Sequence, residues 1–312
     1  MPVEVVYDDH GDGMTLCRYH GDRFGASDFV EESLVSMRDV ELREDDVMLC
    51  SYSKSGCHWM WEILRLLQAG TTDLEVVDKE SHMMEYNTVE QIDALPSPRV
   101  LNNHMPWDMQ PRDLVDKKIK TVFFYRNPKD VAVSFFNHHR KFKDYDYKGT
   151  FNNYLQRLVQ GKVDNGSPFR YLREWEDAIL RHPELPIFVG CYEDMKENPL
   201  SELKRLARFL GHDYSDDFLR QVMHMTTFES MKERKGPASF QDDNGRPIMY
   251  RKGQVGDWVN YFTYEQNKWF DKVIRQAMKG SRLKFRYTLD HSSGRGKSRS
   301  GTMFSVVRQS GQ

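Results

Sequence analysis

The chain has 312 residues, 39% of them hydrophobic, and its 45 Lys and Arg against 47 Asp and Glu leave a net charge of -2. That length can bury the core of one large α/β domain or of two ordinary domains, and the balanced charge excludes a general attraction to nucleic acid, so any phosphate site must be local. Because its four cysteines show no paired CxxC spacing, we expect reduced thiols in a cytoplasmic protein and no metal centre.

Short apolar segments alternate along the chain with longer segments of helical periodicity, a pattern typical of βα units and a parallel sheet. The predicted strands cover residues 47–52, 100–102, 121–125 and 187–191. The predicted helices cover residues 58–68, 129–139, 168–180, 201–210 and 264–278. We therefore expect an α/β fold in which helices flank both faces of a central parallel sheet.

This arrangement predicts a single domain. We expect residues 41–289 to form it, residues 1–40 to pack on it, and residues 290–312, which are rich in Ser, Gly and Arg, to form a disordered tail rather than a phosphate-binding arm. Ligands of open parallel sheets bind beyond the carboxyl ends of the strands. Side chains that directly follow the predicted strands are therefore expected at one edge of the sheet, and these are Lys54, His104, Arg126 and Tyr192.

The first predicted strand and helix are joined by the segment SYSKSGCHW, residues 51–59. Its lysine and glycine precede a helix N-terminus, where free N–H groups and the helix dipole favour an anion. The order differs from the nucleotide-triphosphate loop GxxxxGK[ST], because here the lysine comes before the glycine. We interpret the segment as a phosphate-binding loop. The alternative is a plain strand-turn-helix junction with a solvated lysine.

Three further segments stand out along the chain. They are ALPSPR at 94–99 leading to HMP at 104–106, YRNPKDVAVS at 125–134, and RKGQVGDW at 251–258. Together with the loop at 51–59, they resemble the YPKSGTTW, ALPSPR…THLP, RNxKDVAVS and RKGxxGDW segments of cytosolic sulfotransferases. Members of that family use 3′-phosphoadenosine 5′-phosphosulfate (PAPS) as the sulfuryl donor. Four blocks in the same order, spread over most of the chain, argue against a chance similarity.

The resemblance implies roles for individual residues. The catalytic set would be His104 as general base with Lys54 and Ser134, and the arginine and serine of the second motif, Arg126 and Ser134, would hold the nucleotide 3′-phosphate. Trp59 and Tyr192 would contact the adenine. The donor-binding set that the resemblance implies consists of Lys54, Ser55, Gly56, Cys57, His58, Trp59, Arg126, Ser134, Tyr192, Thr226, Thr227, Phe228, Met231, Arg251, Lys252 and Gly253.

These residue types suit the chemistry of sulfuryl transfer. Charge builds on the bridging oxygen of the departing 5′-phosphate, and the Lys54 ammonium with helix N–H donors can neutralise it without a metal ion. The acceptor hydroxyl loses its proton as it attacks, and His104, with an unperturbed pKa of about 6.5, is suited to take it. The planar guanidinium of Arg126 matches a phosphate.

The chain also departs from the family pattern. Cys57 and His58 replace two threonines that donate to the 5′-phosphate, and a thiol is the weaker donor. Asn102 replaces a lysine two residues before the catalytic histidine, which removes one cation. Met83 and His138 replace two phenylalanines that clamp flat phenols in many members, so an alicyclic or bulkier acceptor is at least as plausible as a simple phenol. The acceptor-binding set implied by the resemblance is Met83, Asn102, Asn103, His104 and His138.

The sequence therefore predicts a PAPS-dependent sulfotransferase acting on a hydroxyl or amine of a small-molecule acceptor. A kinase-like phosphotransferase is disfavoured because it would need the GxxxxGK[ST] order and an acidic magnesium ligand. A catalytically weak protein that binds the nucleotide and a hydrophobic ligand is the second alternative.

No leader or run of 18 apolar residues is present, so we expect no membrane association. The family's dimer signature is degraded around residues 259–268, which favours a monomer or a weak homodimer.

Overall fold

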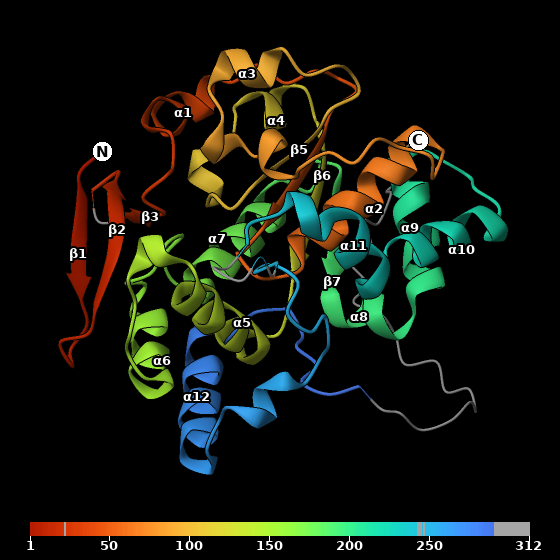
Figure 1. The fold of residues 1–312 in the computed structure, drawn as a ribbon. Coiled ribbons are helices and arrows are strands. Elements are labelled where there is room, and N and C mark those ends of the chain that lie inside the picture. Colours follow the sequence, from red (N-terminus) through yellow and green to blue (C-terminus); the bar gives the residue numbers. More distant parts are fainter. Residues whose placement is uncertain (22, 242–244, 246, 290–312) are drawn as a thin grey trace.

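Four parallel strands form the central sheet of the computed structural model, which describes residues 1–21, 23–241, 245 and 247–289 (Figure 1). The strand order is β5-β4-β6-β7. The strands are β4 (Val47–Ser51), β5 (Val100–Asn103), β6 (Lys120–Tyr125) and β7 (Ile187–Cys191). In register, Cys50 lies opposite Asn103 on one side and Phe123 on the other, so the carboxyl ends of these strands meet at one edge.

Helices cover both faces of this sheet, because alternate strand residues point to opposite sides and both sides are apolar. Val47 and Leu49 of β4 belong to one buried cluster, whereas Met48 and Cys50 belong to another. The first cluster includes residues of α2 (Cys57–Ala69), α8 (Tyr192–Glu197), α9 (Pro199–Leu210) and α10 (Asp216–Met225). The second includes residues of α5 (Pro128–Lys141), α6 (Phe151–Gln160), α7 (Pro168–Arg181) and α12 (Tyr264–Ala277).

The α/β prediction is confirmed. Each of the four predicted strands and five predicted helices is present, and each boundary lies within two residues of the predicted one. Helices α5 and α9 begin earlier than predicted, at Pro128 and Pro199. Proline is favoured in the first helical turn, where its missing N–H is not needed and its fixed φ suits the helix.

The N-terminal segment forms a second, antiparallel sheet that the sequence did not predict. Its strands, in the order β1-β2-β3, are Val3–Tyr7, Gly13–Tyr19 and Arg23–Gly25. Met14 and Leu16 of β2 are fully buried in the same cluster as α5 and α7. The division of the chain at residue 41 stays a prediction. Residues 290–312, the expected tail, lie outside the described residues.

The remaining helices are short and connect the larger elements. The α-helices are α1 (Glu31–Ser36), α3 (Val89–Asp93), α4 (Asp113–Asp116) and α11 (Phe228–Lys235). The 3-10 helices are η1 (Met37–Asp39), η2 (Glu80–His82), η3 (Met84–Tyr86), η4 (Trp107–Met109), η5 (Lys143–Tyr145), η6 (Gly236–Ala238) and η7 (Asp257–Asn260). Within the described ranges, no helix has the length and apolar character needed to cross a bilayer.

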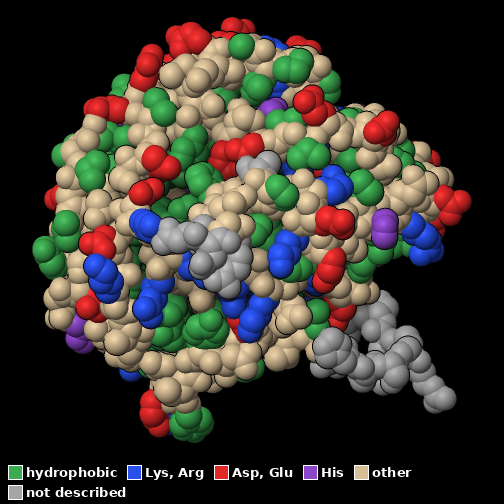
Figure 2. All heavy atoms as spheres, in the orientation of Figure 1, with side chains coloured by type: hydrophobic (Ala, Val, Ile, Leu, Met, Phe, Trp, Pro, Cys, Tyr) green, Lys and Arg blue, Asp and Glu red, His purple; other side chains and the backbone are tan. Residues whose placement is uncertain are grey.

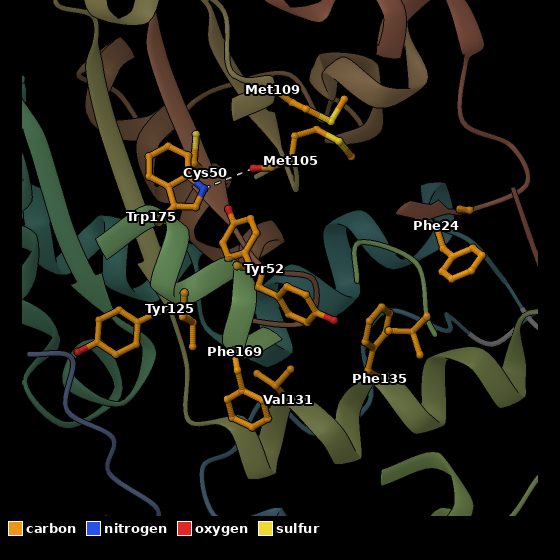
Figure 3. Close-up of a cluster of buried hydrophobic side chains, with 14 of the residues drawn as sticks. Phe24, Cys50, Tyr52, Met105, Met109, Tyr125, Val131, Phe135, Phe169 and Trp175 are labelled. Atoms are coloured by element: carbon orange, nitrogen blue, oxygen red, sulfur yellow. Dashed lines mark hydrogen bonds between the residues drawn. The ribbon is translucent and has the colours of Figure 1, made fainter. Parts of the chain in front are cut away.

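The core behind the strand ends is aromatic (Figure 3). The indole of Trp175 stacks on Phe123 with ring centroids 5.3 Å apart, and its Nε1 donates to the carbonyl of Met105 at 3.4 Å. Tyr52 is also buried, and its hydroxyl donates to the carbonyl of Gly166 at 2.6 Å. Packing therefore fixes the segments that directly follow β4 and β5, which matters because each carries a candidate site residue.

Candidate active site

One cavity opens where the carboxyl ends of the central strands meet. It is lined by Lys54 after β4, His104 after β5, Arg126 after β6 and Tyr192 after β7. These are the residues that the sequence places at one edge of the sheet. Because the strands are parallel, their carboxyl ends lie at the same edge of the sheet. Residues that follow the strands therefore come together whatever their separation along the chain.

The segment after β4 makes a tight turn into α2. Lys54 and Gly56 both have left-handed backbone conformations, with φ of 66° and 97°. A Cβ at Gly56 would lie 2.6 Å from Cδ2 of Tyr192, so only glycine fits there. Helix α2 begins at Cys57, and the first N–H groups of a helix have no intrahelical acceptor. The turn therefore presents N–H donors and the positive helix end to the cavity, as an anion site requires.

Lys54 brings its ammonium into this cavity beside a histidine. Its Nζ lies 3.3 Å from Nδ1 of His138. Burial lowers the pKa of Lys54 to about 8, because a charged amine is poorly solvated there. An anion bound nearby would favour the charged form and raise this pKa again.

His104 is held in one tautomer. Its Nδ1 lies 2.7 Å from the carbonyl oxygen of Ser51, which can only accept, so Nδ1 carries the hydrogen and Nε2 keeps a free lone pair. The backbone N–H of His104 donates to the carboxylate of Glu85. Burial, with the nearby charge of Lys79, lowers the pKa of His104 to about 3, so the ring is neutral at physiological pH.

Arg126 lines the cavity and carries one buried donor without a protein partner. Its Nη2 donates to the carbonyl of Gln254 at 2.7 Å, and its guanidinium lies 4.3 Å from the ring centroid of Tyr192. Its Nε is buried and has no hydrogen-bond partner among the residues that the structure describes. A buried guanidinium N–H without an acceptor is unfavourable, and a phosphate oxygen would supply one. Ser134 of α5 lines the same cavity.

The loop before η7 closes the cavity from the C-terminal side. Arg251 and Lys252 line it, and each donates to the carboxylate of Asp257 at 2.6 Å. Asp130 at the start of α5 accepts the backbone N–H groups of Gly256 at 2.8 Å and Trp258 at 3.1 Å. The motif at 125–134 and the motif at 251–258 are thus tied together by one buried carboxylate.

Most of the other predicted site residues also line the cavity. These are Gly56, Cys57, His58, Trp59, Met83, His138, Thr226, Phe228, Met231 and Gly253. The lining does not include Ser55, Asn102, Asn103 or Thr227. Thr227 caps α11 by accepting the N–H of Ser230 at 3.2 Å, and Asn103 exchanges two hydrogen bonds of 2.9 Å with Gln110.

Several residues of the cavity were not predicted from the sequence. Lys79 and Glu80 line it from the segment before β5, where Nε2 of His58 lies 2.9 Å from Oε1 of Glu80. Asp164 lines it from the loop before α7 and lies 2.5 Å from Nε2 of His139. None of these positions belongs to a recognised motif, so the sequence carried no signal for them.

Basic side chains outnumber acidic ones in the cavity lining, six against four (Asp28, Glu80, Asp144 and Asp164), although the chain as a whole is nearly balanced. The basic side chains that line it are Lys54, Lys79, Arg126, Lys196, Arg251 and Lys252. Figure 2 shows Lys and Arg side chains gathered near the middle of the molecular face viewed there. In the part of the chain that the structure describes, no group of three or more His, Cys, Asp or Glu is placed to hold a metal ion.

Comparison with known proteins identifies the family. The family model described as "Sulfotransferase domain" matches residues 44–282. The chain belongs to the sulfotransferase family. This sulfotransferase is 33% identical over 274 residues to Sulfotransferase 1A1 of Mus musculus, a match that covers 83% of this chain and 93% of the relative. It is 34% identical over 257 residues to Sulfotransferase 1B1 of Mus musculus, covering 77% and 85% of the two chains.

The sulfotransferase also resembles solved structures along most of its length. The crystal structure of mouse sulfotransferase SULT7A1 complexed with PAP matches with a TM-score of 0.73 at 30% identity, over 85% of this chain and 95% of that one. A structure of retinol dehydratase matches with a TM-score of 0.69 over 91% of this chain and 92% of the other, but at 19% identity it supports the fold alone. The family prediction is confirmed, and the protein is an enzyme of this class.

Proposed function

We propose that this sulfotransferase transfers a sulfuryl group from PAPS to a hydroxyl or amine of a small-molecule acceptor. The solved relative complexed with PAP, adenosine 3′,5′-bisphosphate, supports the choice of donor, because PAP is what remains of PAPS after transfer. The observation that carries the proposal is geometric. A glycine turn at a helix N-terminus, a guanidinium with an unused N–H and a histidine with a free Nε2 all line one cavity.

The donor-binding residues divide between the two ends of the nucleotide. The α2 turn with Lys54 would hold the 5′-phosphate, and Arg126, Ser134 and Arg251 would hold the 3′-phosphate. The rings of Trp59 and Tyr192 meet edge to face with centroids 5.3 Å apart, and they would contact the adenine between them and α11. The thiol of Cys57 lies 2.8 Å from Oγ of Ser51, so it already has a polar partner inside the protein.

The proposed reaction is a single displacement at sulfur. An acceptor oxygen forms the new S–O bond, while the bond between sulfur and the bridging phosphate oxygen breaks and its electron pair stays on the 5′-phosphate. His104 Nε2 takes the proton of the acceptor hydroxyl, and Lys54 neutralises the charge on the departing phosphate. The products are the sulfated acceptor, PAP and a proton on His104.

The acceptor would lie on the side of the cavity away from the nucleotide residues. Met83, Tyr86, His138, Phe142 and Tyr145 line the cavity, and the ring of His138 packs on those of Phe142 and Tyr145. Burial holds the pKa of His138 well below its usual value, so a neutral imidazole faces the acceptor. This lining supports a bulky hydroxylated or amine acceptor. Asn102 and Asn103 are not part of the cavity lining, and they would affect acceptor binding only by positioning residues that are.

A catalytically weak binding protein is the second candidate. The low pKa of His104 favours it, because a general base works best when its pKa is near the working pH. The thiol of Cys57 favours it as well, because a thiol is a weak donor. The negative charge of PAPS would raise the pKa of His104, which is the reason that we place the enzyme first.

Two measurements test the proposed function. Purified protein is incubated with PAPS and a panel of hydroxyl and amine acceptors without added metal, and release of PAP is followed. In parallel, PAP at a hundred times its Kd is expected to stabilise the fold by about 2.7 kcal/mol, which corresponds to about 4 °C in melting temperature for a chain of this length. AMP and ATP should give much smaller shifts. Arg126→Leu should abolish the advantage of PAP over AMP, whereas Arg208→Leu, an exposed arginine of α9, should keep it.

The outcomes separate the candidates. PAP release with at least one acceptor supports the enzyme, and a PAP-specific shift without turnover on any acceptor supports the binding protein. Equal shifts with PAP and AMP would reject the 3′-phosphate site.

We further propose a cytoplasmic monomer or weak homodimer. Around the degraded dimer signature, Val259 and Tyr264 are exposed to 55% and 71%, and sedimentation at micromolar concentration would report any association.

A further inference from the structure

A second lysine is buried in the cavity beside the candidate base. The side chain of Lys79 is only 2% exposed. Its Nζ lies 3.0 Å from Oδ1 of Asn102, 3.0 Å from Sδ of Met83 and 3.6 Å from Oε1 of Glu80. Burying an ammonium group is costly unless it is paired and hydrogen-bonded. Met83 is a poor acceptor and Glu80 is shared with His58, so this cation is only partly compensated.

Asn102 is oriented to hold this cation. Its Nδ2 donates to the carbonyl of His82 at 2.9 Å and to the carbonyl of Lys79 at 3.3 Å, which turns Oδ1 toward the ammonium. A parallel bridge between Met83 and Asn102 fixes the segment beside β5. Asn102 is the position at which the family resemblance expects a lysine. In this chain the position is an asparagine, and its amide oxygen accepts a hydrogen bond from Lys79 of the neighbouring segment.

The charge of Lys79 acts on the groups around the reacting centre. It is the second cause, after burial, of the lowered pKa of His104. It also acts on the pKa values of Cys57 and His58 at the α2 turn. The geometry agrees, because Lys79 lines the same cavity as His104, and Glu80 Oε1 lies 3.6 Å from Nζ of Lys79 and 2.9 Å from Nε2 of His58 at the α2 turn. The sulfuryl group must lie between the candidate base and the candidate phosphate site in the proposed reaction.

We propose that Lys79 is a catalytic residue that donates to the sulfuryl oxygens during transfer and so supplies the cation that Asn102 does not. This inference rests on the proposed function. Lys79 exchanges no proton in the reaction. As the S–O bond to phosphate breaks, the negative charge on the sulfuryl oxygens and the departing phosphate is met by two ammonium groups, Lys79 and Lys54. Asn102 is then a positioning residue, which orients Lys79 from behind.

The test uses the difference between PAPS and PAP, because only PAPS carries the sulfuryl group. Lys79→Met should lower kcat by about a hundredfold, the loss seen when one transition-state donor is removed. It should weaken PAPS binding at least fivefold and leave PAP binding within threefold. Lys79→Gln, which can still donate to Asn102 but has no charge, should behave like Lys79→Met. Lys120→Met is the control, since Nζ of Lys120 donates to the carbonyl of Leu210, outside the cavity lining.

The second part of the experiment places a lysine at position 102 of β5, where the family resemblance expects one. In the Lys79→Met background, Asn102→Lys should raise kcat at least tenfold, because a lysine at 102 reaches the same part of the cavity. In the wild-type background the same substitution should lower kcat, because two ammonium groups would then meet within hydrogen-bond distance. A kcat within threefold of wild type in both Lys79 variants would overturn the proposal. Equal weakening of PAP and PAPS binding would also overturn it, because Lys79 would then serve the nucleotide alone.

The two proposals can fail separately. If the wild type releases no PAP with any acceptor, the proposed function fails. The binding comparison still decides whether Lys79 contacts the sulfuryl group. If turnover is observed and the Lys79 variants retain it, the proposed function stands and the assignment of Lys79 falls.

Discussion

His104 combines an orientation suited to proton transfer with a pKa that is low for a base. The hydrogen bond from Nδ1 to the carbonyl of Ser51 leaves Nε2 as the only ring position that can accept a proton. The pKa of about 3 belongs to a ring surrounded by buried groups and by the cation Lys79. Two phosphates and a sulfuryl group carry enough negative charge to counter that cation.

This geometry predicts that removing the imidazole affects turnover and spares binding. His104→Ala should lower kcat by roughly a hundredfold or more, the usual contribution of a general base. PAP affinity should stay within about threefold of wild type by calorimetry. Lys54→Ala should lower both, because a cation at a phosphate contributes to binding as well as to the transition state. His10→Ala, an exposed histidine outside the cavity lining, is the control. Unchanged turnover in His104→Ala would move the role of base to His58.

At the scale of an element, the turn into α2 depends on the backbone of one glycine. We expect Gly56→Ala to weaken PAP binding at least tenfold, because the new Cβ would meet Tyr192 at 2.6 Å and shift the turn. Gly211→Ala is a matched control. Gly211 has the same φ of 97°, but the nearest atom to its Cβ would be Nζ of Lys120 at 3.5 Å. Both variants should lose about 1–2 kcal/mol of stability from the left-handed backbone, and only Gly56→Ala should lose affinity. Equal affinities for PAP would contradict this account.

The elements that the sequence predicted are those with strong local signals. Apolar runs bounded by motifs located the four central strands, and the parallel topology then brought Lys54, His104 and Arg126 to one edge. Strands β1 to β3 were missed. No residue of β1 is fully buried, and in β2 the adjacent residues Leu16 and Cys17 are both buried, which interrupts the alternation of a strand. Lys79 was missed for a different reason. Its place in the cavity depends on a tertiary contact with Asn102, and a lysine in a polar segment gives no sign of burial.

At the scale of the whole molecule, the fold keeps five buried or half-buried histidines neutral. Burial lowers the pKa of His58, His82, His104, His138 and His139 below the usual value, for His82 to about 4. Burial has the opposite effect on Glu85, whose pKa rises to about 7. The histidines make the fold less stable on mild acidification, while Glu85 opposes that trend. The contribution of one group is therefore best isolated by comparing two variants.

His138 is the histidine whose contribution can be tested most directly, because the resemblance places a phenylalanine there. Above pH 6.5 its ring is neutral in both the folded and the unfolded chain, and its stability contribution is constant. As the pH falls below 6.5 the unfolded chain takes up a proton that folded His138 does not, so the wild type loses stability that His138→Phe keeps. Between pH 7.5 and 5.5 the difference should grow by about 1.4 kcal/mol in favour of His138→Phe. Urea unfolding at each pH measures it. His224→Phe, on the exposed side of α10, should follow the wild type, and parallel curves for His138→Phe and wild type would show that His138 is not buried in its neutral form.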